Sequence, residues 1–115
     1  MTGTDLYRRM CAFNYGDAER AAVMREVWDP TPWMVEIYTG QCGDERDREM
    51  QRWCHDEFGG QSWPLHGRPA RWLRGSVTVH GWTWYGFADQ AGMDRFVAHW
   101  PAPEGVRQPD TAPAG

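Results

Sequence analysis

The sequence contains no lysine and few of the branched aliphatic residues that fill most protein cores. All twelve basic residues are arginine, and the 115 residues include three leucines and one isoleucine. Such a shortage of aliphatic residues is typical of disordered chains. Eight tryptophans and a net charge of only −4 argue against disorder, because each large ring can bury roughly 150–250 Å². We therefore expect one small domain whose core consists largely of aromatic rings.

Long apolar segments are also missing. No apolar run approaches the roughly 18 residues of a membrane span, and no apolar segment at the N-terminus indicates a secretory signal. The three cysteines, Cys11, Cys42 and Cys54, are an odd number without any Cys-x-x-Cys pair. We therefore expect reduced thiols, a cytoplasmic location, and neither a metal site nor a membrane association.

Recognisable catalytic and cofactor motifs are absent as well. The sequence has no nucleophile elbow, no phosphate-binding loop and no dinucleotide fingerprint. His66, His80 and His99 are scattered along the chain, and the charged residues between Asp44 and Arg52 read as a solvated helix face. The sequence therefore predicts a protein that is not an enzyme and has no cofactor. Its mildly acidic character disfavours non-specific nucleic-acid binding, which usually needs a basic surface.

The pattern along the chain divides it into three parts. Residues 1–30 are predicted to be a helical segment, with a helix that Asp17 caps and Pro30 ends, although its first half also fits an extended arm. Residues 31–101 are predicted to form an α+β core domain, and the proline-rich residues 102–115 a flexible tail. Within the core we expect a strand in 32–40, a helix in 44–59, a hairpin in 71–89 that turns at His80–Gly81, and a helix in 89–100.

The order β-α-β-β-α predicts a two-layer α+β sandwich of the ferredoxin-like kind, with an added N-terminal helical segment. The strand–helix–strand crossover should be right-handed, and both core helices should cover one face of the sheet. One edge of the sheet is left vacant in this arrangement. Either the N-terminal segment covers that edge, or it pairs with a second copy of the chain.

The hairpin has two faces, and both carry aromatic rings. One face is predicted to hold Val77, Val79, Trp82 and Trp84, and the other Trp72, Arg74, Thr78, Thr83, Tyr85 and Phe87. We expect the first face to lie beneath the helices, because a chain so poor in aliphatic residues must bury most of its rings to fold. The opposite face would then offer an aromatic surface to a protein partner or a second copy. Its candidate partner-binding residues are Tyr38, Trp72, Arg74, Tyr85 and Phe87.

Alternatively, the tryptophans are a stacking platform. "HGWTWYGF" at 80–87 and "IYTG" at 37–40 resemble the two aromatic strand motifs of RNA-recognition-motif domains, with Trp82, Trp84 and Tyr38 at stacking positions. The resemblance covers residues 34–100, but the chain is acidic and no final strand is visible. It implies binding of single-stranded nucleic acid through aromatic sheet residues. The residues concerned would be Tyr38, Arg71, Arg74, His80, Trp82 and Trp84.

A second resemblance concerns the whole core. The short strand, the helix containing "RWCHDEFG", the aromatic hairpin and the closing helix with Phe96 and Trp100 are similar to small uncharacterised proteins encoded by bacteriophages. This resemblance covers residues 33–101. It implies a phage-encoded accessory or host-interaction protein, located in the cytoplasm of a bacterial host, and it implies no activity. The sequence thus favours a non-enzymatic protein-interaction domain whose partner is unknown.

Overall fold

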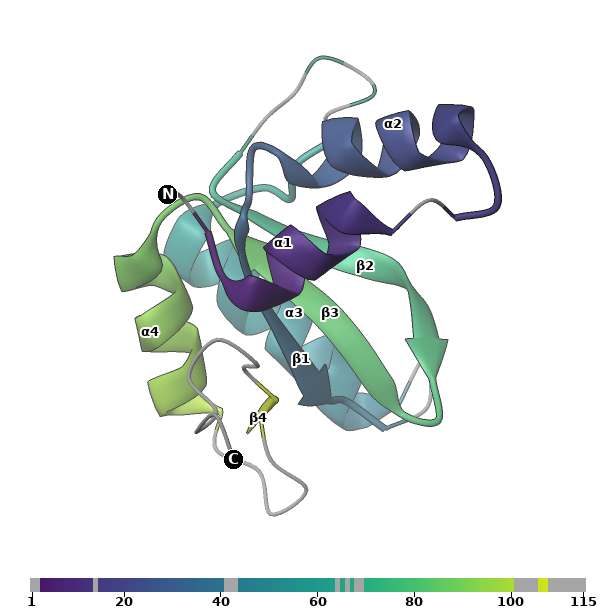
Figure 1. Ribbon diagram of the computed structural model, residues 1–115. Coiled ribbons are helices and arrows are strands. Elements are labelled where there is room, and N and C mark those ends of the chain that lie inside the picture. Colours follow the sequence, from purple (N-terminus) through teal and green to yellow (C-terminus); the bar gives the residue numbers. More distant parts are fainter. Residues whose placement is uncertain are drawn as a thin grey trace.

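A central antiparallel sheet lies between two pairs of helices (Figure 1). The computed structural model describes residues 3–13, 15–40, 44–63, 65, 67, 70–100 and 106–107. The elements are α1 (Asp5–Ala12), α2 (Ala18–Trp28), β1 (Trp33–Tyr38), α3 (Glu45–Phe58), β2 (Trp72–Val79), β3 (Trp82–Phe87), α4 (Gln90–His99) and β4 (Val106–Arg107). The α+β class is as predicted. Within the described ranges, every helix is too short or too polar to cross a membrane.

The ends of the helices follow local sequence signals. Asp17 precedes α2 and its Oδ1 accepts a hydrogen bond from the Arg20 amide at 2.7 Å. Asp89 does the same for α4, with its Oδ1 2.7 Å from the Gly92 amide. Gly59 follows α3 with a φ of 92°, which costs glycine little. These ends are set by residues within one turn of the helix, so the sequence predicts them correctly.

The strands are arranged in the order β2-β3-β1-β4, and all neighbours are antiparallel. The β2–β3 hairpin turns at His80 and Gly81, which both have positive φ, 52° and 87°. Two such residues are the signature of a type I′ turn, which matches the twist of the strands. The predicted turn is therefore confirmed. β1 pairs with β3 along its whole length and with the two residues of β4 on its other side.

One face of the sheet carries the larger core. Val35 and Ile37 of β1 and Tyr85 and Phe87 of β3 are fully buried there. Phe96 of α4 joins these strands, because its ring lies 4.8 Å from that of Tyr85 and 5.0 Å from that of Phe87. The remaining buried members come from α3, β2 and α4: Met50, Cys54, Phe58, Trp72 and Met93. The two core helices thus share one face.

The second face is covered by the N-terminal helices, so the molecule has three layers rather than the two predicted. Leu6 and Met10 of α1 and Trp28 of α2 pack on Met34 and Leu73 of the sheet. The physical reason lies in β1, where large apolar side chains point both ways. Met34 and Val35 are adjacent and both fully buried, so each face of the sheet needs a cover.

The orientation predicted for the hairpin is wrong. Trp72, Tyr85 and Phe87 lie beneath α3 and α4, and Trp82 and Trp84 point to the opposite face. Val77 and Val79, which were expected in the core, are exposed at the tip of β2: Val77 66% and Val79 57%. Alternation specifies which residues share a face, but it does not specify which face the helices cover. Tyr85 and Phe87 lie beneath the core helices because their rings pack directly against the ring of Phe96.

A buried ion pair joins α3 to β2. Arg74 Nε lies 2.9 Å from Asp47 Oδ1, and its Nη2 lies 3.0 Å from Oδ2. The side chain of Arg74 is 10% exposed and that of Asp47 is 2% exposed. Arg74 Nη1 also donates to the Gly75 carbonyl at 2.8 Å, where the ladder between β2 and β3 shifts register. The arginine therefore both anchors the helix and stabilises a bulge in the edge strand.

We predict that Asp47→Ala lowers the free energy of unfolding by about 3–5 kcal/mol, because it leaves the guanidinium of Arg74 buried without its counter-charge. Urea denaturation followed by circular dichroism measures the effect. Glu57→Ala is the matched control, since it removes the acid of an exposed helix pair with Arg95 and should cost less than about 1 kcal/mol. Equal losses in the two variants would contradict the structural role of the buried pair.

Candidate functional site: a groove beside β2

Two glycines of the hairpin form a shallow seat for the indole of Trp28. A Cβ on Gly86 would come within 2.9 Å of Trp28 Cζ3 and within 2.5 Å of the Thr31 carbonyl oxygen. A Cβ on Gly75 would lie 3.4 Å from Trp28 Cζ2. Glycine inside a strand often marks such a close approach. The seat brings the C-terminal end of α2 down onto the sheet, with the Trp28 and Trp84 rings edge to face at 6.0 Å.

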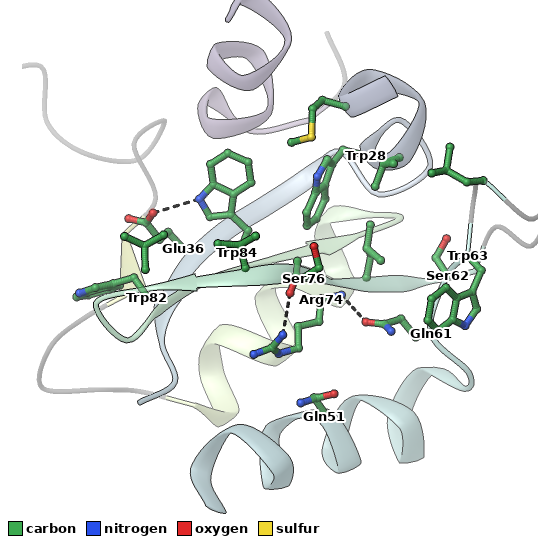
Figure 2. Close-up of a pocket in the computed structure, with 17 residues that line it drawn as sticks. Trp28, Glu36, Gln51, Gln61, Ser62, Trp63, Arg74, Ser76, Trp82 and Trp84 are labelled. Atoms are coloured by element: carbon green, nitrogen blue, oxygen red, sulfur yellow. Dashed lines mark hydrogen bonds between the residues drawn. The ribbon is translucent and has the colours of Figure 1, made fainter. Parts of the chain in front are cut away.

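A groove opens next to this seat and follows β2. Its volume is about 780 Å³, within the roughly 300–1,000 Å³ range of small-molecule sites. Figure 2 shows Trp28 and Trp84 on one side of β2, with Arg74 turned to the other side, toward α3. We call this feature the β2 groove. Its apolar lining comes from α2, the sheet and the loop before β2: Met24, Val27, Trp28, Trp63, Leu65, Leu73, Val77, Val79, Trp82 and Trp84.

The rim of the β2 groove concentrates the exposed apolar surface of the described residues. Six large apolar side chains are exposed among the described residues, and four of them line the groove. These four are Val77 and Val79, with Trp63 at 47% and Leu65 at 54% exposure. Singly exposed apolar residues are ordinary, but a cluster around a concave surface indicates a site of interaction.

The charged groups of the β2 groove are already engaged within the fold. The Arg74 guanidinium is held by Asp47 and also donates to Thr78 Oγ1 at 3.2 Å. Glu36 accepts a hydrogen bond from Trp84 Nε1 at 3.1 Å. Its other polar lining residues are uncharged: Gln51, Gln61, Ser62 and Ser76. The groove therefore favours an occupant that is apolar or hydrogen-bonding rather than one that needs a charged anchor.

Most of the predicted partner-binding residues are buried in the structure. Trp72 is almost fully buried, Tyr85 and Phe87 are fully buried, and Arg74 is held by Asp47. These four lie under α3 and α4, so they cannot present a surface to a partner. Tyr38 is half-buried at the far end of the sheet. The aromatic surface predicted on this face is therefore closed by the helices.

The residues proposed for nucleic-acid binding are only partly brought together. Tyr38 and Trp82 are neighbours, with ring centroids 5.7 Å apart, and Trp84 points to the same face as Trp82. Arg71 instead lies over the Phe58 ring at 5.2 Å on the opposite face. Arg74 is turned toward α3, and His80 is exposed in the turn. The two arginines are thus separated from the rings that they were expected to accompany.

The cysteines form no cluster in the described residues. Cys54 is fully buried on α3, and burial raises the pKa of its thiol well above the ordinary value. Cys11 is half-buried on α1, while Cys42 and His66 lie outside the described residues. Among the described residues, no group of three or more His, Cys, Asp or Glu side chains is placed to hold a metal ion.

The β2 groove is not predicted from the sequence, although the sequence contains three signals of it. Gly75 and Gly86 interrupt strands and leave room for a ring. Trp28 is the large ring just before the proline that ends α2. Val77 and Val79 sit at alternate positions of an uncharged stretch, residues 75–79. No local rule pairs Trp28 with the two glycines, because they are about 50 residues apart in the sequence and meet only in the folded chain.

We predict that Gly86→Ala lowers the free energy of unfolding by about 1–3 kcal/mol, because the added methyl group displaces Trp28 and Thr31 from the sheet. Urea denaturation followed by tryptophan fluorescence measures the loss. Gly60→Ala is the matched control, since a Cβ there meets nothing within 4 Å and should change stability by less than about 0.5 kcal/mol. A Gly86→Ala protein as stable as the control would show that α2 is not seated on this glycine.

The comparisons with known proteins add no relative. No family model, no curated protein and no solved structure matches the chain. The resemblances to phage-encoded proteins and to RNA-recognition-motif domains therefore stay predictions from the sequence. A function has to be argued from the β2 groove itself.

Proposed function

We propose that this chain is a small non-enzymatic protein-interaction domain that binds its partner through the β2 groove. The observation that carries the proposal is the gathering of Val77, Val79, Trp63 and Leu65 at the rim of one concave surface. Removing such side chains from water is the main driving force of protein association. Aromatic residues at the centre and few charges are also typical of the buried part of interfaces.

The chemistry of the groove supports binding rather than catalysis. Among the described lining residues, the one arginine is held by Asp47, and the one carboxylate, on Glu36, accepts a hydrogen bond from Trp84. General acid–base work needs a titratable group within hydrogen-bonding reach of a substrate. The groove instead offers indole rings, aliphatic side chains and uncharged amides and hydroxyls, which bind without reacting.

The proposal extends to context and fold family. The similarity to small phage-encoded proteins supports an accessory or host-interaction role in the bacterial cytoplasm. The strand order β2-β3-β1-β4, with α3 between β1 and β2 and α4 after β3, supports the ferredoxin-like arrangement. In that arrangement the added helices α1 and α2 provide one wall of the groove, so they would be the part of the chain that specialises the fold.

Binding of single-stranded nucleic acid is the second candidate. It is favoured by Tyr38, Trp82 and Trp84, which lie on the sheet face away from α3 and α4. Against it, Arg71 and Arg74 lie on the other side of the sheet. From there they cannot contact the phosphates of a nucleic acid whose bases stack on those rings. Base stacking contributes about 1–3 kcal/mol per base, but affinity also needs phosphate contacts.

We predict that peptides selected from a display library for binding to the wild-type chain lose about tenfold or more in affinity for the Val77→Lys variant, because the ammonium must enter an apolar rim. Fluorescence anisotropy of the labelled peptides measures the loss. Phe13→Lys is the matched control, since Phe13 is also exposed, at 61%, and lies outside the groove.

Two results would go against this function. The first is that no selected peptide distinguishes Val77→Lys from Phe13→Lys. The second is that mixed single-stranded oligonucleotides quench tryptophan fluorescence at low salt while no peptide binds, which would favour the stacking platform instead.

A further inference from the structure

The two outer edges of the sheet differ in how far other segments of the chain cover them. At the β1 edge, the Thr4 hydroxyl donates to the Met34 carbonyl at 2.9 Å and accepts from the Met34 amide at 3.0 Å. β4 then pairs with Glu36 and Ile37. The N-terminal segment and β4 together thus cover this edge. An edge covered in this way cannot pair with another chain.

The β2 edge is covered only in its first half. The Ser62 amide donates to the Trp72 carbonyl at 2.9 Å, and the Arg74 amide donates to Gln61 Oε1 at 2.7 Å. Beyond Arg74, no backbone hydrogen bond joins the outer side of residues 75–79 to another described segment. The open stretch is therefore the half of β2 that carries Val77 and Val79.

The pairing register shows which backbone groups face outward there. Arg74 lies opposite Tyr85, and Thr78 lies opposite Thr83. Tyr85 and Thr83 are two residues apart in β3, so in an antiparallel ladder they have the same orientation. Because the Arg74 amide points outward to Gln61, the backbone amide and carbonyl of Thr78 point outward as well. The open half of β2 therefore presents hydrogen-bonding groups between two exposed valines.

Charge limits what can lie on this edge. Residues 75–79, "GSVTV", carry no charge, and the neighbouring Arg74 is matched by Asp47 within the fold. A charged occupant would lose hydration without gaining a partner. A matching strand must therefore be uncharged, with apolar side chains to place beside Val77 and Val79. Residues 77–79 of a second copy, at the end of the bulge, meet these conditions.

The chain's own C-terminal residues do not meet them. After Arg107 the sequence reads "QPDTAPAG", which contains no large apolar side chain to place against Val77 and Val79. Its two prolines cannot donate to a ladder. β4, which precedes this segment, is also attached to β1 at the opposite edge of the sheet.

We propose that two copies of this chain associate by antiparallel pairing of the open halves of their β2 strands, so that one sheet continues through the dimer; this rests on the proposed function and names the partner. The pairing is isologous, and each copy presents the same residues to the other. Because the antiparallel pair leaves both copies facing the same way, Val77 and Val79 of one copy lie beside those of the other, and the two β2 grooves adjoin.

The strand contact alone does not account for a stable dimer. A standard interface buries about 800 Å² on each partner, and the bulge at residues 75–77 keeps the shared ladder short. The apolar rim has to supply the remaining area, through Val77 and Val79 at the pair and Trp63 and Leu65 nearby. This requirement predicts that the valines control association more strongly than the backbone does.

Sedimentation equilibrium over a wide range of concentrations tests the proposal on the full chain. We expect the wild type to dimerise, and Val77→Lys and Val79→Lys to weaken the dimer by about tenfold or more, because lysine on an edge strand opposes pairing. Phe13→Lys should dimerise like the wild type, and so should Val77→Ile, which keeps a branched apolar side chain. Circular dichroism and thermal melting establish that each variant is folded.

A charge-rescue experiment separates pairing at β2 from any other mode of association. Mixing Val77→Lys with isotopically labelled Val77→Glu should restore a mixed dimer in native mass spectrometry, because antiparallel pairing brings the two substituted positions close together. A wild-type monomer at every concentration, or a dimer indifferent to both lysine variants, overturns the proposal. If such a monomer still binds selected peptides in a Val77-dependent way, the interaction function stands and only the second copy is excluded.

Discussion

The bidentate contact between Arg74 and Asp47 is the interaction on which the rest of the arrangement depends. It fixes α3 beneath the hairpin and, through the Gly75 carbonyl, stabilises the bulge in β2. A buried pair of this kind is costly to break, because either partner alone would be a charge without hydration. The same contact turns Arg74, the only arginine among the described residues that line the β2 groove, away from it. One interaction therefore organises both the core and the surface.

Covering both faces of a small sheet requires the helices to approach the strands closely, and glycines in the strands allow this approach. Gly75 and Gly86 allow the Trp28 indole to lie on the strands, so α2 packs on a face that would otherwise be open. The cover is incomplete, because Val77 and Val79 at the tip of β2 stay exposed. The β2 groove follows β2 from the loop that carries Trp63 and Leu65 to this exposed tip, with Trp28 of α2 in its lining.

Features governed by neighbouring residues could be predicted from the sequence. The helix boundaries at Asp17, Gly59 and Asp89 and the turn at His80–Gly81 depend on backbone groups a few residues away. The candidate site could not be predicted in the same way. The sequence predicts an open surface for Trp72, Tyr85 and Phe87, which lie in the core, and a core position for Val77 and Val79, which are exposed. In both cases the sharing of a face was right and its direction was wrong.

The α+β class, the positions of the elements and the reliance on rings where aliphatic residues are scarce can all be predicted from the sequence. These follow from periodicity and composition, which act within one element at a time. Tertiary structure alone decided which face of the hairpin the core helices cover, where the N-terminal helices lie, and that half of β2 is left open. Those outcomes depend on contacts such as Phe96 with Tyr85, Trp28 with Gly86 and Arg74 with Asp47, whose partners lie far apart in the sequence. The free energies of these contacts depend on how all the layers pack together.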